Sequence, residues 1–364
     1  MAKKKYYAVA KGVKTGIFNS WEECEQYVIG YKGAVHHSFA DKEAARSWLI
    51  EKQIELDINI DDNVENEYQE FYGLNVPVAI DEYGDLPPAV ERAMLKVLGV
   101  STIGELSSEM VQSIRDKGWF YSETCETDYH GRALSYMLLY LPVNFYKIWT
   151  PLLECLKNGR LVNEAKVLEL GPGPGTATMS LMAFYAQLAL ANPQEQFSLD
   201  ITCIEKEKDF VSLFKELTNT YMCDLRTIPN LKIKKNIYQG NAFDFMYNEE
   251  RHTYDIIIES NMMNSNERID GERLEIFVNG LHQNLNDKGI AVMIEPGTYD
   301  QIVILEDLVA KSTNKSSMRC LFGPERVVQD NTRMSFLKEL IDIGLRCKKN
   351  YQHWFTYTVL EMIE

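Results

Sequence analysis

The chain has 364 residues and a formal net charge of −15, from 38 basic and 53 acidic side chains. This length allows two or three domains and at least one large core. The charge excludes a surface that is basic all round, as a general nucleic-acid coat requires. No stretch approaches the ~18 to 20 consecutive apolar residues of a membrane-spanning helix. We therefore expect no membrane contact, and any contact with nucleic acid must be local.

The seven cysteines lie far apart, without a C-x-x-C pair or a cysteine and histidine cluster at metal-ligand spacing. We expect reduced thiols and predict no metal site. The lysines at residues 3–5 are followed by a short apolar run and further lysines, so the apolar core of a secretory signal is missing. These features predict a cytoplasmic protein.

Residues 1–52 predict a small α+β domain with a mildly basic surface, since they carry nine Lys or Arg against six Asp or Glu. Ser20 is placed to cap a helix, and Glu23 stands in the capping-box position three residues later. The expected elements are a strand at 6–10, a return strand from 17, a helix at 21–28, a strand ending at 39 and a helix capped by Asp41.

Residues 53–88 are acidic and predict a linker, because residues 53–91 carry eleven acids and no base. Residues 89–160 show helical spacing of apolar residues and predict a helical block. From residue 161 to 364 strands and helices alternate, which favours an α/β sheet with helices on both faces. Strands are expected at 167–170, 198–204, 231–238, 255–259, 289–295, 345–351 and 354–362, with the last two forming an antiparallel edge.

A glycine-rich loop follows the first strand of this sheet, in the sequence Glu-Leu-Gly-Pro-Gly-Pro-Gly at 169–175. Without Cβ atoms, Gly171, Gly173 and Gly175 let backbone amides approach a ligand, and Thr176 opens the following helix. A tight strand-to-helix turn is the alternative when such a pattern stands alone.

Three further segments accompany the loop. Glu205 ends the next strand, where a carboxylate can accept both hydroxyls of a ribose, although its spacing exceeds the roughly 20 residues of the dinucleotide fingerprint. Asn241 and Ala242 follow the third strand, where an adenine edge can be contacted. Ser260 and Asn261 end the fourth, and the Asn261 amide either orients an acceptor or caps the next segment.

These four segments resemble the successive cofactor motifs of class I S-adenosylmethionine-dependent methyltransferases. The resemblance implies a Rossmann-like, seven-stranded class I methyltransferase fold, here preceded by the helical block and the small N-terminal domain. It implies S-adenosyl-L-methionine as the cofactor, with the three glycines at its methionine part, Glu205 at the ribose, and Asn241 with Ala242 at the adenine. Thr176, Ser260 and Asn261 complete the candidate cofactor-binding residues. Glu169 would orient the loop or the cofactor amine.

Residues 130–300 loosely resemble the methyltransferase-like proteins of mitochondrial small ribosomal subunits, through the stretches at 136–146 and 295–298. Those proteins carry a cysteine cluster beyond the second stretch, whereas this chain has only Cys320 and the distant Cys347 there. We therefore predict no iron–sulfur site.

Residues 5–50 resemble the hybrid-binding domain of eukaryotic-type ribonuclease H and caulimovirus viroplasmin, through their tyrosines, the Lys-Thr-Gly-Ile-Phe run at 14–18, Trp21 and Phe39. That family binds RNA duplexes or RNA/DNA hybrids by shape, 2′-hydroxyl and phosphate contacts. The segment 35–38 departs from the family pattern. The aromatic residues are core residues in the alternative interpretation. The candidate contacts are Tyr7, Lys11, Lys14, Thr15, Trp21, His36 and His37.

Our first functional hypothesis is an RNA methyltransferase to which the N-terminal domain brings duplex or hybrid substrate. A noncatalytic cofactor-binding assembly or nucleic-acid-binding factor and a small-molecule or protein methyltransferase are the alternatives. The sequence has no Pro-Cys dipeptide for cytosine C5 chemistry and no Asn-Pro-Pro-Tyr for amino methylation. Glu259 and Glu295 are candidate bases or structural acids, so the sequence assigns no catalytic residue and no protein partner.

Overall fold

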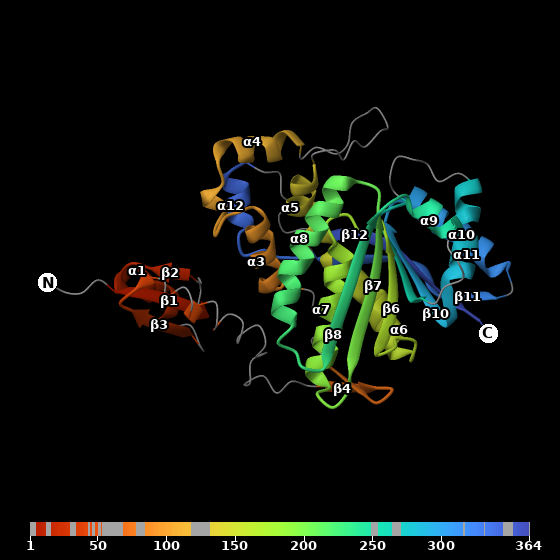
Figure 1. The fold of residues 1–364 in the computed structure, drawn as a ribbon, viewed down its shortest axis with the longest axis horizontal. Helices are drawn as coiled ribbons and strands as arrows, with labels where there is room; N and C mark the ends of the chain where they lie inside the picture. Colours follow the sequence, from red (N-terminus) through yellow and green to blue (C-terminus); the bar gives the residue numbers. More distant parts are fainter. Residues whose placement is uncertain are drawn as a thin grey trace. The chain divides into compact units, whose positions relative to one another are not determined.

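The computed structural model describes residues 5–11, 16–29, 34–42, 44–45, 48–49, 52, 68–77, 84–117, 132–248, 254–263, 271–315, 317–330, 332–344 and 352–363. The chain divides into two compact units, one of Met1–Asn66 with Pro87–Ala89 and the other of Glu67–Leu86 with Val90–Glu364. Each unit is described by itself (Figure 1). Within the described residues no helix has both the length and the apolar character needed to cross a bilayer.

The first unit is a small antiparallel sheet with a helix, as the sequence predicts. Its elements are β1 (Tyr6–Lys11), β2 (Gly16–Phe18), α1 (Trp21–Val28) and β3 (Val35–Phe39), with the strand order β2-β1-β3. The predicted cap forms, because the Glu23 N–H donates to Ser20 Oγ at 3.2 Å and the Glu23 carboxylate accepts from the Asn19 N–H. A core of Val9, Phe18, Cys24 and Val28 lies between α1 and the sheet.

The second unit begins with a hairpin where the sequence predicted only linker. Its strands, β4 (Tyr68–Phe71) and β5 (Leu74–Pro77), pair antiparallel. Leu74 and Val76 are buried, and Asn192 accepts a hydrogen bond from the Asn75 N–H at 2.7 Å. Part of the acidic segment therefore forms a hairpin that packs in the second unit.

The helical block precedes the large sheet. It contains α3 (Pro88–Val97), the 3-10 turn η2 (Ile103–Glu105), α4 (Ser108–Lys117), α5 (Ala133–Asn144), the 3-10 turn η3 (Phe145–Ile148) and α6 (Trp149–Lys157). The Trp149 indole N–H donates to the Ser180 carbonyl at 3.1 Å, which ties α6 to the helix after the glycine loop. Lys147 is buried in η3, among apolar residues.

The large sheet has seven strands in the order β11-β12-β10-β9-β6-β7-β8. They are β6 (Glu164–Leu170), β7 (Phe197–Glu205), β8 (Leu231–Gln239), β9 (Tyr254–Ser260), β10 (Leu285–Pro296), β11 (Met318–Asp330) and β12 (Gln352–Met362). β8, β7, β6, β9 and β10 pair in parallel, and β12 runs antiparallel between β10 and β11. This topology confirms the predicted Rossmann-like α/β fold.

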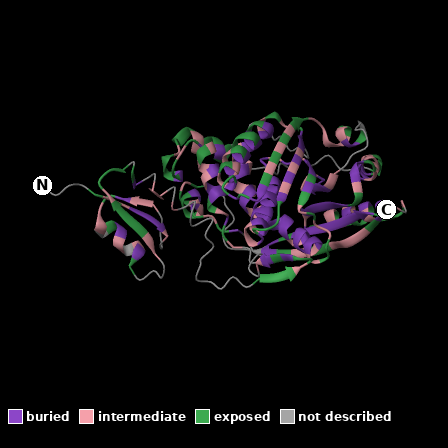
Figure 2. Ribbon diagram, turned by 60° about the horizontal axis from the view of Figure 1, so that its bottom comes forward, coloured by how far each residue is buried: buried purple, intermediate pink, exposed green. Residues whose placement is uncertain are grey.

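Helices cover both faces of this sheet (Figure 1). On one face lie α7 (Thr176–Ala191) and α8 (Lys208–Leu225), and on the other lie α9 (Ala242–Asn248), α10 (Gly271–Asn284) and α11 (Tyr299–Thr313). A short helix, α12 (Leu337–Asp342), follows β11. Figure 2 shows that the interior of this unit is buried, whereas exposed and partly buried residues alternate along the edge strand β8.

The antiparallel edge contains one predicted strand and one that the sequence analysis did not predict. Its outer strand is β11, which the sequence analysis missed, and β12 confirms the prediction at 354–362. The predicted strand at 345–351 lies outside the described residues.

Candidate functional site

The glycine loop turns the chain sharply between β6 and α7. Gly171, Gly173 and Gly175 have φ values of 63°, 55° and 92°, in the left-handed region where a Cβ atom is unfavourable. The Gly171 N–H donates to the Ile204 carbonyl at 2.9 Å, and the Gly175 N–H donates to the Pro172 carbonyl at 2.9 Å. The first bond holds the loop against the end of β7, and the second closes a turn within the loop.

The three glycines meet different surroundings. A Cβ at Gly175 would lie 2.8 Å from the Phe214 ring, and one at Gly171 would lie 3.1 Å from Met262. A Cβ at Gly173 would meet nothing within 4 Å. Gly171 and Gly175 therefore permit close packing, whereas Gly173 leaves open space where a ligand can approach the backbone.

Glu205 connects this loop with the end of β7. Its buried carboxylate accepts the Gly173 N–H at 2.9 Å on Oε2 and the Glu207 N–H at 2.8 Å on Oε1. Burial raises the pKa of Glu205, and these two backbone hydrogen bonds oppose that effect. Each carboxylate oxygen has about two lone pairs, so each retains capacity for a second donor such as a hydroxyl.

Glu169 lies beneath the loop rather than at its open side. It is buried and accepts a hydrogen bond from the Thr178 hydroxyl of α7. Burial, helped by the negative charge of Glu205 and opposed by the Thr178 hydrogen bond, raises the pKa of Glu169 to about 7. Thr176 is also buried at the start of α7. The Glu169 contact joins β6 to α7, the two elements that flank the loop.

Asn241 caps a helix, which the sequence analysis did not anticipate. Its Oδ1 accepts the Phe243 N–H at 2.8 Å and the Asp244 N–H at 3.4 Å, so its oxygen is committed to the start of α9. The preceding Gly240 N–H donates to the Glu205 carbonyl at 2.9 Å. Asn241 and the partly buried Ala242 are thereby held next to the end of β7.

Asn261 follows β9 with a φ of 60°. Its N–H donates to the Ile294 carbonyl at 2.8 Å, and its amide Nδ2 donates to Ser260 Oγ at 3.0 Å. The Lys147 ammonium lies 3.5 Å from the Asn261 Oδ1. The Asn261 side chain thus has partners on both sides, and Lys147 is a site residue that the sequence analysis missed.

Two buried acids hold the backbone that follows β9. Glu259 Oε1 accepts the Met262 N–H at 2.6 Å, and Glu295 Oε1 accepts the Met263 N–H at 2.9 Å. Burial raises the pKa of both carboxyls, and the charge of Glu259 raises that of Glu295 further. Through these contacts Glu259 and Glu295 hold the backbone that follows β9.

The loop, Glu205, Asn241 and Ser260–Asn261 all follow the carboxyl ends of neighbouring strands. The strand order reverses between β6 and β9, and ligands of open α/β sheets bind outside the carboxyl ends at such a reversal. The structure therefore brings together the four predicted segments. In the described part of the chain no cluster of three or more His, Cys, Asp or Glu could hold a metal ion.

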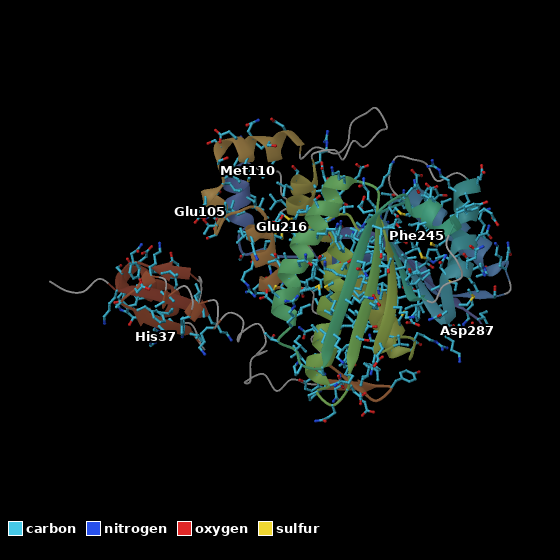
Figure 3. The ribbon with its side chains drawn as sticks, in the orientation of Figure 1. His37, Glu105, Met110, Glu216, Phe245 and Asp287 are labelled. Carbon is cyan, nitrogen blue, oxygen red and sulfur yellow. The ribbon has the colours of Figure 1, made fainter. Side chains whose placement is uncertain are left out.

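In the first unit, the predicted contact residues fall into two groups. The Tyr7 ring lies 5.6 Å from the Trp21 ring, which lies 5.6 Å from the His36 ring. His37 instead lies 4.9 Å from Phe39 and 5.8 Å from Trp48 (Figure 3 labels His37).

Strand geometry explains this separation, since His36 pairs with Val9 and His37 with Ala8 on successive β1 positions. Successive strand residues face opposite sides of a sheet. Both histidines are exposed, and Lys11 ends β1. Lys14 and Thr15 lie outside the described residues. Among the candidate contacts that the structure describes, Tyr7, Trp21 and His36 lie together, and we call these three residues the Trp21 face.

Comparison with known proteins identifies the first unit. Residues 5–49 match the family model of the ribonuclease H1 N-terminal domain, which confirms the predicted resemblance. Ribonuclease H of Saccharomyces cerevisiae is 50% identical over 44 residues, covering 12% of this chain and 13% of that protein. The enzyme of Schizosaccharomyces pombe is 44% identical over 46 residues, covering 13% and 17%. The match thus spans less than a fifth of these curated relatives.

Solved structures similar to this chain include a TehB-like SAM-dependent methyltransferase from Corynebacterium glutamicum. It has a TM-score of 0.32 and 10% identity, with 61% of this chain and 97% of that chain covered. Fibrillarin of Aeropyrum pernix, crystallised with S-adenosyl-L-methionine, has a TM-score of 0.30 and 14% identity, with 59% and 76% covered.

Proposed function

We propose that this protein is an S-adenosylmethionine-dependent methyltransferase that acts on RNA, with the first unit supplying a duplex or hybrid contact. The observation that carries the proposal is the contact between the Gly173 N–H and the buried Glu205 carboxylate at the strand-order reversal. The contact places a glycine backbone with open space beside it next to an acid that can accept further hydrogen bonds. A nucleoside with an attached polar chain can use both, the backbone for its polar chain and the acid for its ribose hydroxyls.

The residues present fit such a donor. Gly173 leaves the space beside the loop open, so the methionine part would lie against the backbone of 171–175. Glu205 would accept the ribose hydroxyls, while the segment at Asn241 and Ala242 would contact the adenine. Bound there, S-adenosylmethionine would supply an electrophilic methyl group. Methyl transfer depends on an in-line approach and on exclusion of water, so positioning groups suffice for much of the rate.

The acceptor side is proposed to be formed by Ser260 and Asn261. Lys147 and Ser260 hold the Asn261 amide from two sides, while Glu259 and Glu295 hold the backbone that follows. A preorganised amide of this kind can orient an acceptor without moving when it binds. The arrangement favours the orienting role of Asn261 over the capping role.

The RNA assignment rests on the first unit. Its Trp21 face offers two aromatic rings and an imidazole, groups that suit stacking and backbone contacts with nucleic acid. The second unit belongs to a chain with a net charge of −15, which attracts phosphates poorly. A linked binding unit would raise the local concentration of the acceptor at the second unit.

Calorimetry with S-adenosylmethionine and its demethylated product tests the donor site. We expect Glu205→Ala to weaken binding about tenfold or more, because a charge-assisted pair of hydrogen bonds is lost. Glu207→Ala is the matched control, since its backbone N–H, not its side chain, contacts Glu205. Equal affinity of the Glu205 variant and the wild type would place the ribose elsewhere.

Transfer of a radiolabelled methyl group to separated RNA, DNA and protein fractions tests the acceptor. Label in RNA, reduced when residues 1–52 are deleted, is the expected result. Cofactor binding without transfer would favour a noncatalytic assembly factor. Label in protein or in small molecules would favour the third alternative and overturn the RNA assignment.

A further inference from the structure

An exposed aromatic and cationic surface lies on the antiparallel edge of the large sheet. Val328 of β11 pairs with Trp354 of β12, and Arg326 pairs with Thr356, so Trp354, Arg326 and Val328 face the same side. The Arg326 guanidinium lies 4.0 Å from the centre of the Trp354 ring, and 49% of Trp354 is exposed. We call this pair the Arg326–Trp354 stack.

The stack is fixed at the carboxyl edge of the sheet, where the proposed donor site lies. The Gly297 N–H donates to the Trp354 carbonyl at 3.0 Å, and Gly297 directly follows the end of β10. A Cβ at Gly297 would lie 2.8 Å from the Trp354 Cβ, so the two backbones are in close contact. β10 is also the strand that carries the buried Glu295, whose partner in β12 is Thr356.

Core packing does not account for the position of Trp354. Its neighbour Phe355 and the next odd residue, Tyr357, are buried on the other side of β12. Tyr299 and Val303, one turn apart at the start of α11, are exposed as well. Exposed aromatic residues at the rim of a candidate site are more typical of binding surfaces than of folding cores.

The chemistry of the stack selects its ligand. A planar guanidinium over an indole offers a flat surface on which an unpaired nucleobase can stack, and stacking of this kind tolerates any base. Arg326 is a single cation, and Asp300 stands next to Tyr299 in the sequence, so this surface has little net positive charge to attract a phosphate backbone. The surface therefore suits an unpaired base better than the backbone of a duplex.

We propose that the Arg326–Trp354 stack binds an unpaired base of the RNA acceptor strand next to the donor site. This inference rests on the proposed function, and it divides the work between the two units. The first unit binds paired nucleic acid, and the stack holds a single-stranded segment that enters the second unit.

The test measures the affinity of the full chain for a fluorescein-labelled, unstructured 12-nucleotide RNA by anisotropy. We expect Trp354→Ala to weaken binding about tenfold, because one base loses its stacking partner. Trp354→Phe should keep most of the affinity. Tyr68→Ala is the matched control, since Tyr68 is 47% exposed on β4, outside the patch.

Salt dependence and cofactor binding sharpen the test. The slope of affinity against salt should be unchanged by Trp354→Ala, because stacking releases no counterions. Affinity for the demethylated cofactor should also be unchanged, which shows that the variant is folded. Unchanged RNA affinity in Trp354→Ala, or an equal loss in Tyr68→Ala, would overturn the stack as a base-binding site, as would a wild type that does not bind the RNA.

The inference and the proposed function fail in different ways. Binding that depends on Trp354 without any methyl transfer to RNA would contradict the proposed activity and leave the stack in place. Transfer to RNA that is equally fast in Trp354→Ala and in the wild type, at limiting RNA, would contradict the stack and leave the activity in place. Selective binding of a protein through Trp354, with no effect on RNA, would likewise overturn the inference.

Discussion

The candidate contacts of the two units come from different chemical groups. In the first unit the contacts are exposed side chains on a small sheet, represented by Tyr7, Trp21 and His36. In the second they are backbone amides and buried carboxylates, represented by Gly173 and Glu205. The first unit should therefore respond to side-chain truncation, and the second to changes in backbone conformation and buried charge.

Gly175→Val should have the largest effect. The residue has a φ of 92°, and a Cβ would lie 2.8 Å from Phe214 and 3.0 Å from Thr218. Backbone strain and overpacking together should lower the free energy of unfolding by about 4 kcal/mol. Denaturant unfolding measures it. Gly99→Val is the control, because Gly99 also has a positive φ, 71°, but no atom lies within 4 Å of an added Cβ. This control should lower the free energy of unfolding only by the contribution of backbone strain. Equal losses would refute the packing argument.

Glu169→Gln should change the pH dependence of stability. The pKa of Glu169 is raised from 4.5 to about 7, so the folded state holds its proton more tightly than the unfolded state does. The resulting stability is complete below about pH 4.5 and is lost as the pH rises through about 7. Relative to the wild type, the Gln variant should gain about 3 kcal/mol between pH 4.5 and pH 8.

Chemical denaturation across this pH range measures the difference between the two proteins. Glu164→Gln is the control, since Glu164 is exposed on the same strand. If the difference in the free energy of unfolding between the wild type and Glu169→Gln stays constant with pH, Glu169 is ionised in the folded protein over this range.

Gly173→Ala should separate binding from stability. Its φ of 55° costs about 1 kcal/mol, yet no atom lies within 4 Å of the added Cβ. Cofactor affinity should fall about tenfold or more, because the methyl group takes the space of the ligand. Calorimetry measures the affinity and thermal unfolding the stability, with Gly99→Ala as the control. Unchanged affinity would place the ligand away from the loop.

His36→Ala should have the smallest effect. It should weaken binding of an RNA/DNA hybrid about fivefold, because His36 belongs to the Trp21 face. His37→Ala should weaken it less, since His37 faces the opposite side of the sheet. Titration of a labelled hybrid at fixed salt gives both values. A larger loss in His37→Ala would place the nucleic acid on the other side.

Local patterns determined how much could be predicted from the sequence. The Ser20 cap, the β6–α7 loop and the acid at the end of β7 depend on neighbouring residues, and all three were predicted. β11 was missed because Gly323-Pro324 interrupts it and two charged residues, Glu325 and Arg326, follow directly, which favours a loop by sequence criteria. The hairpin at 68–77 was missed because only Leu74 and Val76 are buried against the rest of the unit.

Contacts between distant segments limited the prediction of the site. Lys147 lies 114 positions from Asn261 in the chain, and the only local signal was a lysine within an apolar run. The use of the Asn241 oxygen as a helix cap depends on where α9 begins. The separation of His36 from His37 follows from the strand period, which the sequence shows only once β3 is recognised.

The order of strands at the antiparallel edge has a consequence for biosynthesis. β11 precedes β12 in the chain, but β12 separates it from β10. While the chain emerges from a ribosome, β11 therefore has no neighbour to pair with until residues 352–362 have also appeared. The half-built sheet exposes the hydrogen-bonding edge of β10 during that interval. Vectorial synthesis thus makes β12 the strand that closes the sheet and assembles the Arg326–Trp354 stack in the same step.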